Sequence, residues 1–429
     1  MEQEAIRDYI LEWINKSVDS GMARTLQVSN IRSRATIIIG PRRAGKTYYL
    51  YQIANRIGKD KTLYLNFEDT RLRGLEPKDV KDLIRLYIET TSKAPEVLLF
   101  DEIQNISGWE LIVRELLDAR TYSIYITGSS SRMLSREIAT QLRGRSITYL
   151  MLPFSFTEYL RAIGKEVDTN KITRDAAAVL RNTLMEYLEW GGFPEVVLNP
   201  KNRESILKEY YDLILFKDIV ERNSMKNISL ARLLLEQLLQ NFSKEFSVNS
   251  IMNKASGVRM SKDATYDYVD KIQDSVALFF LNRFSKKASS RESWPKKAYA
   301  CDTGLTKIVK FSTDKGKLIE NCVFLELLRK INQMPLVKLS YFKDISQKEV
   351  DFVVKKSERV IALMQATNAS SKEEIEEREI AALIAAAKVT KCSNLMVITW
   401  NYGDIRRMGK KKITFIPLWK WLLEGAKLT

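Results

Sequence analysis

The chain has 429 residues, of which 45% are hydrophobic, and its 69 Lys and Arg against 53 Asp and Glu give a formal net charge of +16. This length suggests about three domains of ~150 residues, and the basic excess favours nucleic acid first and anionic membrane second as a partner, unless it is only a basic surface. The absence of histidine excludes histidine-based triads and Cys/His zinc fingers, and we expect the three separated cysteines to be reduced core residues.

Two further features bear on location. No run reaches the ~18 uninterrupted apolar residues of a membrane span, and the N-terminal sequence lacks the basic and then apolar pattern of a signal peptide. We therefore expect a cytoplasmic protein without a membrane partner.

Residues 1–30 are predicted to begin with an amphipathic helix. Its apolar residues are Ile6, Tyr9, Ile10, Trp13 and Ile14, which share one face at helical spacing. We expect this helix to pack on the domain that follows.

Residues 31–160 alternate between short apolar strands and helical segments. The predicted strands are 36–39, 62–67, 96–101, 123–127 and 146–151. This alternation indicates an α/β fold with a parallel sheet, helices on both faces, and a ligand site beyond the carboxyl ends of the strands.

A phosphate-binding pattern follows the first of these strands and opens a helix. It reads Gly40-Pro41-Arg42-Arg43-Ala44-Gly45-Lys46-Thr47, with Tyr48 next in the helix. Backbone N–H groups of such a loop surround phosphates, so residues 40–48 are the predicted nucleotide-binding segment. Lys46 is expected to neutralise the β- and γ-phosphates and Thr47 to hold Mg²⁺, with ATP or GTP as the nucleotide.

A second functional pattern is an apolar strand that ends in two acids, about 55 residues after the loop. Asp101 is expected to reach the Mg²⁺ shell and Glu102 to polarise the attacking water. After the next strand, Ser129 is placed to orient that water. Arg145, with Arg143 as the alternative, is a candidate for contacting transition-state charge, in its own subunit or a neighbour, or for a surface ion pair.

These segments together resemble a family of prokaryotic AAA+-type ATPases that carry a C-terminal domain of uncharacterised function. The motifs are the loop 40–47, Leu-Asn-Phe-Glu-Asp (65–69), Phe-Asp-Glu-Ile-Gln-Asn (100–105), Thr-Gly-Ser-Ser (127–130), Leu-Pro-Phe-Ser-Phe-Thr-Glu-Tyr-Leu (152–160), Gly-Gly-Phe-Pro-Glu (191–195) and Ile-Glu-Asn-Cys-Val-Phe (319–324). The resemblance implies an AAA+ core (31–160), a helical lid (161–240), a winged helix (241–300) and a domain like the PD-(D/E)XK nucleases (301–429).

The winged-helix segment also has support from its own residues. Residues 247–255 and 261–275 have helix-turn-helix spacing, and 277–284 and 298–300 can pair as a wing with a basic tip. The candidate DNA-binding residues are Lys262, Lys286, Lys287, Arg291, Lys296 and Lys297. Such a wing contacts phosphates, but winged helices also dock proteins.

The C-terminal region resembles a nuclease that has lost part of its active site. Nucleases of the PD-(D/E)XK type need a helical Glu, an Asp on a hairpin and Glu-x-Lys on the next strand, and Glu320 and Asp351 supply the first two. A hairpin turning at about residue 357 places Gln365 and Thr367 where Glu-x-Lys is expected. We expect this domain to be inactive, unless Glu349 or Lys348 replaces the lost groups.

We therefore predict an ATP-hydrolysing AAA+ protein that uses Mg²⁺, binds DNA, and remodels or signals from the DNA-bound state. One alternative is a nucleotide-dependent switch that recruits a protein partner, and another is an ATP-dependent nuclease. A homo-oligomer is compatible with each of them.

Overall fold

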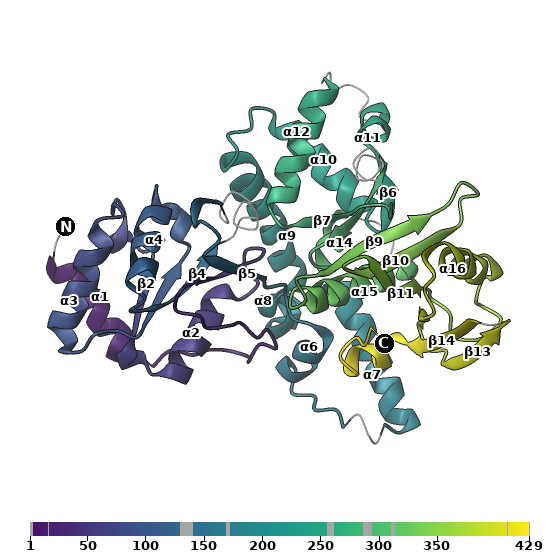
Figure 1. Ribbon diagram of the computed structural model, residues 1–429, viewed down its shortest axis with the longest axis horizontal. Coiled ribbons are helices and arrows are strands. Elements are labelled where there is room, and N and C mark those ends of the chain that lie inside the picture. Colours follow the sequence, from purple (N-terminus) through teal and green to yellow (C-terminus); the bar gives the residue numbers. More distant parts are fainter. Residues whose placement is uncertain are drawn as a thin grey trace. The chain divides into compact units, whose positions relative to one another are not determined.

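The computed structural model describes residues 3–15, 17–128, 140–168, 172–254, 261–285, 294–309, 314–409 and 411–428. The candidates Ser129, Lys286, Lys287 and Arg291 lie outside these ranges. The chain divides into two compact units, Met1–Met151 and Leu152–Thr429 (Figure 1). Within the described residues, no helix combines the length and apolar character that crossing a bilayer requires.

The first unit is built on a five-stranded parallel sheet in the order β2-β3-β4-β1-β5. Its strands are β1 (Ala35–Ile39), β2 (Thr62–Asn66), β3 (Val97–Asp101), β4 (Ser123–Gly128) and β5 (Ser146–Leu150). Every residue of β1, β3 and β4 is buried, as is typical of parallel strands covered on both faces. The predicted α/β fold with a parallel sheet is confirmed.

Helices connect these strands and cover the sheet (Figure 1). They are α1 (Gln3–Asn15), α2 (Lys46–Ile57), α3 (Asp79–Thr91) and α4 (Trp109–Ala119), with short 3₁₀ turns η1 (Lys59–Lys61), η2 (Thr70–Leu72) and η3 (Ile103–Asn105). Helix α1 packs as predicted, since Trp13 donates from its indole N–H to the carbonyl of Thr62 at 2.9 Å and stacks on Tyr64. The N-terminal helix is therefore part of the first unit and supports the edge strand β2.

The second unit begins with a helical segment. Its elements are α6 (Phe156–Ala162), α7 (Arg174–Trp190), α8 (Pro194–Leu198), η5 (Pro200–Asn202), α9 (Arg203–Leu213), the π-helix η6 (Ile214–Glu221) and α10 (Ile228–Gln240). Leucine and aromatic side chains of α9, η6 and α10 form one buried core with Phe193 and Leu278. The predominantly helical character expected for 161–240 is confirmed, whereas its role as a lid stays a prediction.

Two helices and a small antiparallel sheet follow. They are β6 (Lys244–Phe246), α11 (Val248–Lys254), α12 (Lys262–Asp274), β7 (Leu278–Leu281) and β8 (Lys296–Ala300), with the sheet order β6-β8-β7. The Ser261 hydroxyl caps α12 by accepting from the backbone N–H of Ala264 at 3.2 Å. Both predicted helices and the predicted strand pairing are present. The segment between α11 and α12 and the tip between β7 and β8 fall largely outside the described residues.

The C-terminal part contains a six-stranded mixed sheet in the order β13-β14-β12-β11-β10-β9. Its elements are α14 (Gly304–Val309), α15 (Lys315–Ile331), β9 (Val337–Lys343), β10 (Glu349–Lys356), β11 (Arg359–Ala366), α16 (Glu377–Thr390), β12 (Leu395–Thr399), β13 (Asp404–Met408), β14 (Lys411–Pro417) and α17 (Leu418–Leu423). Strands β10 and β11 form the expected hairpin, in which Phe352 is paired with Met364. The hairpin therefore sets Asp351 beside Gln365, as predicted.

Candidate nucleotide site

The loop between β1 and α2 requires glycine at two positions. A β-carbon at Gly40 would lie 2.0 Å from the carbonyl oxygen of Met151. Gly45 has a φ of 97°, in the left-handed region that favours glycine, and directly precedes α2. The loop thus passes close to the end of β5 and then opens a helix, whose first N–H groups have no acceptor within the helix and can bind an anion.

The side chain of Lys46 is folded back over this loop. Its Nζ donates to the carbonyl oxygens of Gly40 and Pro41, each at 3.1 Å, and only 5% of the residue is exposed. The same ammonium lies 3.8 Å from Oε1 of Glu102. Lys46 is therefore positioned inside the loop, where phosphate oxygens are expected to bind.

Asp101, the last residue of β3, is the centre of a buried hydrogen-bond network. Its Oδ2 accepts from the Thr47 hydroxyl at 2.7 Å and from the Tyr64 hydroxyl at 2.8 Å, and its Oδ1 accepts from the Thr127 hydroxyl. Burial raises the pKa of Asp101, and the charge of Glu102 adds to the increase. The network fixes the carboxylate beside the first turn of α2.

Glu102 follows directly and is held by both its backbone and its side chain. Its φ of 52° is unusual for a residue other than glycine. The Glu102 N–H donates to the Thr127 hydroxyl at 3.0 Å, and the carboxylate accepts from the Gln104 amide. The structure thus brings together Lys46, Thr47, Asp101 and Glu102, from two segments of the chain.

The remaining candidates of the first unit lie differently. Arg145 forms an ion pair with Asp118 of α4. Its carbonyl accepts from the Ala35 N–H at the start of β1, whereas the loop follows the other end of that strand. Tyr48 is half exposed, and a β-carbon at Gly21 would lie 3.0 Å from its ring. The prediction that Arg145 acts on the nucleotide of its own subunit has no support in this geometry.

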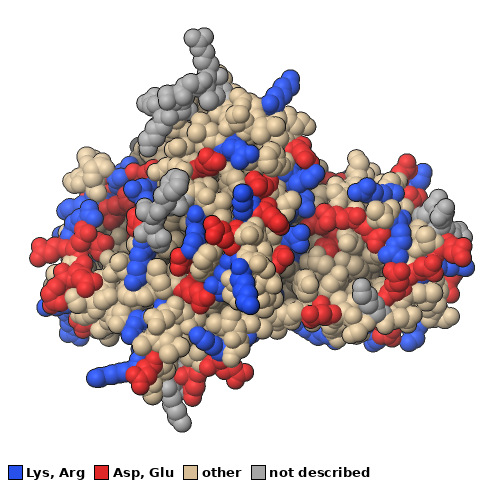
Figure 2. Space-filling view, turned by 180° about the vertical axis from the view of Figure 1, so that it is seen from behind, with Lys and Arg blue, Asp and Glu red and all other residues tan. Residues whose placement is uncertain are grey.

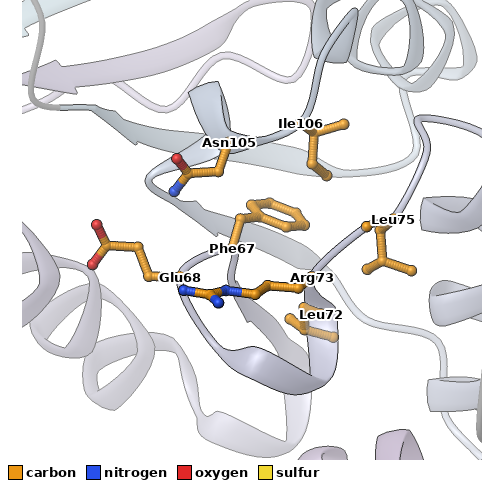
Figure 3. Close-up of a pocket in the computed structure, with 8 residues that line it drawn as sticks. Phe67, Glu68, Leu72, Arg73, Leu75, Asn105 and Ile106 are labelled. Carbon is orange, nitrogen blue, oxygen red and sulfur yellow. The ribbon is translucent and has the colours of Figure 1, made fainter. Parts of the chain in front are cut away.

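A cavity of about 510 Å³ lies beyond the carboxyl ends of β2 and β3 (Figure 3). It is lined by Phe67, Glu68, Leu72, Arg73, Gly74, Leu75, Asn105 and Ile106. Glu68 also forms an ion pair with Arg42 of the loop at 3.4 Å. The cavity wall is therefore connected to the phosphate loop by one charged contact.

A second polar cluster lies in the second unit, at the residues compared with nucleases. Lys297 Nζ lies 2.9 Å from Glu320 Oε1, 2.7 Å from Glu349 Oε1 and 2.9 Å from Asp351 Oδ1. Burial alone would lower the pKa of Lys297, but the charges of Asp351 and Glu320 outweigh it and raise the pKa well above its ordinary value. The pKa of Glu320 is raised to about 7, by burial and by the charge of Asp351.

These contacts correct one prediction. Lys297 was expected at the tip of a DNA-binding wing, but it is 2% exposed and its ammonium is bound to carboxylates, so it is not available to a DNA phosphate. Gln365 accepts from the Asp351 N–H at 3.3 Å, which agrees with the predicted register of the hairpin. The nearby Glu349 is part of the cluster, whereas Lys297 is a lysine that the sequence comparison did not propose.

The surface of α12 carries more acid than base. The exposed residues of this helix are Lys262, Asp263, Tyr266, Asp267, Asp270 and Gln273. Lys296, at the start of β8, is partly buried. On the face shown in Figure 2, basic and acidic side chains are interspersed rather than gathered in one basic area. Charge at α12 therefore does not match the backbone of DNA.

Comparison with known proteins assigns these units. Residues 32–160 match the family model described as AAA domain, and 181–315 and 315–421 match two domains of unknown function, DUF8612 and DUF4143. The chain is 36% identical to "Uncharacterized protein MJ1544" of Methanocaldococcus jannaschii over 411 residues. The matched region covers 93% of this chain and 90% of that protein. The chain belongs to the family of this archaeal protein.

Other relatives extend to bacteria. An "Uncharacterized protein" of Haemophilus influenzae is 29% identical over 337 residues, covering 76% of this chain and 80% of that protein. The solved structure titled "The walker-type atpase paby2304 of pyrococcus abyssi" covers 64% of this chain and 90% of its own at 13% identity, but its TM-score of 0.41 carries no conclusion. The AAA domain match and the parallel sheet together show that the first unit of this family member has the fold of a P-loop AAA-type ATPase.

Sequence reasoning did not find three residues that shape the site of this AAA domain. Tyr64 in β2 binds the Asp101 carboxylate, and Gln104 binds that of Glu102. Arg24 donates to the Ala44 carbonyl of the loop at 2.6 Å. Tyr64 lies between two leucines in β2, where its hydroxyl was the available signal, whereas Arg24 lies in a segment without any motif.

Proposed function

We propose that the protein hydrolyses ATP in the presence of Mg²⁺ at the site formed by Lys46, Thr47, Asp101 and Glu102. The observation that carries the proposal is the 2.7 Å hydrogen bond between the Thr47 hydroxyl and the Asp101 carboxylate. Two oxygen groups held this closely beside a phosphate loop are suited to one Mg²⁺ shell, directly or through water.

Lys46 and Glu102 complete the proposed chemistry. Phosphate oxygens are stronger partners for an ammonium than neutral carbonyls are, so we expect Lys46 to leave Gly40 and Pro41 when nucleotide binds. Glu102 would then lose its nearby cation and accept a hydrogen bond from the attacking water. Gln104 donates to the other carboxylate oxygen, Oε2, so this contact can persist while the water binds at Oε1.

The test is ATP hydrolysis by the full chain with MgCl₂. Lys46→Ala should abolish nucleotide binding, and Glu102→Gln should keep binding but slow turnover about 10²- to 10⁴-fold, the range for a positioned acid–base group. Glu115→Gln, at an exposed acid of α4, is a matched control that should keep wild-type turnover. Equal turnover by Glu102→Gln and wild type would show that Glu102 is not the base.

We further propose that β6, α11, α12, β7 and β8 form a winged helix. The order of these elements and the β6-β8-β7 sheet support it. The net charge of +16 and the basic residues Lys286, Lys287, Arg291 and Lys296 support DNA as its partner.

A second candidate function is nucleotide-dependent recruitment of a protein, and α12 favours it. In a helix-turn-helix fold the second helix enters the major groove, between two rows of phosphates. Asp263, Asp267 and Asp270 are exposed on that helix and would be repelled there. A basic protein surface would instead be attracted by these aspartates.

A further inference from the structure

The ammonium of Lys297 has all of its hydrogen-bonding capacity filled by carboxylates. A lysine ammonium has three N–H donors. Glu320, Glu349 and Asp351 each place one oxygen 2.7 to 2.9 Å from Nζ. The residue is 2% exposed, so no water shell replaces these partners.

The three acids are fixed by contacts of their own. The Tyr299 hydroxyl donates to Glu320 Oε1 at 2.7 Å, and the Ala366 N–H donates to Asp351 Oδ2 at 3.0 Å. Lys343 lies 3.4 Å from the second carboxylate oxygen of Glu349. The three carboxylates around Lys297 are thus held in place by contacts of their own.

The cluster is also more acidic than its lysines can neutralise. Glu379 of α16 adds a further carboxyl group, whose Oε2 is buried and has no hydrogen-bond partner among the described residues. Burial and the charge of Asp351 raise the pKa of Glu379 to about 7. Carboxylate oxygens such as those of Glu320, Glu349 and Asp351 are the ligands that hard divalent cations bind.

We propose that the Lys297 side chain occupies a divalent-cation site, as a tethered cation supplied by β8. Oxygen ligands lie about 2.3–2.6 Å from Ca²⁺, so shifts of a few tenths of an ångström separate the observed cage from a metal site. Lys297 Nζ lies within 2.9 Å of an oxygen of each of the three acids, and among the described residues no group of three or more acids or cysteines could hold a metal ion. Through its ion pairs with Glu320 and Asp351, the lysine also connects the three-stranded sheet to α15 and β10.

The proposal does not depend on ATP hydrolysis. It predicts that Lys297 and a divalent cation exclude each other. Lys297→Met is the sharpest test, because methionine retains the length of the apolar stem and removes only the ammonium position. Lys343→Met is the matched control. Lys343 contacts Glu349 and Glu245 at the rim of the cluster, and its replacement leaves the Lys297 ammonium in place.

The experiment measures Mn²⁺ binding by electron paramagnetic resonance and thermal unfolding with EDTA or Ca²⁺, on the full chain without nucleotide. Lys297→Met should bind about one Mn²⁺ more than wild type, unfold at a lower temperature in EDTA, and be restabilised by Ca²⁺. A Mn²⁺ ion bound at Asp101 would be present in wild type and in every variant, so it does not contribute to the difference in bound Mn²⁺ between them.

Two further variants separate the outcomes. Lys343→Met should bind no additional Mn²⁺. Lys297→Met/Asp351→Asn should also lose the additional ion, and it should fold more readily than Lys297→Met because one of the buried carboxylates has been removed. If Lys297→Met folds only with Mn²⁺ or Ca²⁺, the proposal is supported. No additional Mn²⁺ in a folded Lys297→Met, or an equal additional ion in Lys343→Met, would overturn it.

Discussion

Thr47 donates a 2.7 Å hydrogen bond to Asp101, although 54 positions separate the two residues in the chain. The contact exists because β1 and β3 are parallel and flank β4, so both end at the same edge of the sheet. Tyr64 reaches the same carboxylate from β2, on the other side of β3. Side chains from β2 and from the first turn of α2 thus converge on the buried acid that ends β3.

The first prediction concerns this acid. Asp101→Asn places an amide N–H₂ among three hydroxyl donors, and it removes the charge that attracts Mg²⁺. Hydrolysis should fall at least about 10²-fold, as when one preorganised electrostatic group is lost. The measurement is the ATPase rate over a range of MgCl₂ concentrations.

Tyr64→Phe is the control for this prediction. It removes one hydrogen bond to Asp101 but leaves the carboxylate and Thr47 in place. Its magnesium dependence should resemble that of wild type. If Asp101→Asn and wild type respond equally to magnesium, Asp101 is not part of the metal shell.

The predictable part of this site is local in sequence. The loop 40–48 and the acids 101 and 102 carry their signal in adjacent residues, and five apolar strands alternating with helices imply a parallel sheet. The function of Lys297 was not predictable in the same way. Its basic neighbours suggest an exposed tip, whereas its environment comes from acids 23, 52 and 54 positions away, which only the folded chain brings together.

The second prediction concerns Arg145. This residue is exposed and paired with Asp118, so we expect it to act, if it contacts nucleotide, on that of a neighbouring subunit. Arg145→Ala should lower hydrolysis and leave ATP affinity within a few-fold, and wild-type specific activity should rise with protein concentration. Asp118→Ala is the control, because it breaks the same surface pair without removing the arginine. Equal losses in both variants would assign the pair a structural role.

The third prediction follows from Asp302, which fixes the Gly-Gly motif. Its carboxylate accepts from the Gly192 N–H at 2.7 Å and the Gly304 N–H at 2.9 Å, and a β-carbon at Gly191 would lie 1.7 Å from it. Burial raises the pKa of Asp302 from 3.8 to about 6, against these hydrogen bonds. The folded state therefore binds a proton that the unfolded chain has released between about pH 4 and pH 6.

The sign of the effect follows from this linkage. The stabilisation from protonated Asp302 is complete below about pH 4 and is lost as the pH rises through 6, by about 2–3 kcal/mol for a shift of this size. Asp302→Asn should remove this pH-dependent contribution. It should also lower the stability at every pH, because the amide has one acceptor oxygen and loses one of the hydrogen bonds from Gly192 and Gly304. Chemical unfolding at pH 5 and pH 7 measures it: the advantage of wild type over the variant should shrink at pH 7. A constant difference would contradict the raised pKa.

The last prediction separates DNA from protein as the partner of α12 and the wing. Neutralising one phosphate contributes about −0.9 to the slope of log affinity against log salt on duplex DNA. Replacing Lys286, Lys287, Arg291 and Lys296 by alanine should flatten that slope by several units if the wing binds phosphates. Lys297 is left unchanged, because its ammonium belongs to the acid cluster. Binding should weaken similarly for all sequences, since phosphate contacts position a protein without reading bases.

The acids of α12 provide the opposite test in the same titration. If this helix enters the major groove, Asp263→Asn, Asp267→Asn and Asp270→Asn together should tighten DNA binding, because three charges facing phosphates are removed. If the helix docks a basic protein, the same triple variant should leave DNA affinity unchanged and weaken that complex, with a salt dependence of its own. Identical salt slopes for wild type and the wing variant would remove the wing from DNA binding. Absence of wild-type binding to DNA at low salt would leave the protein-recruiting switch as the function of this region.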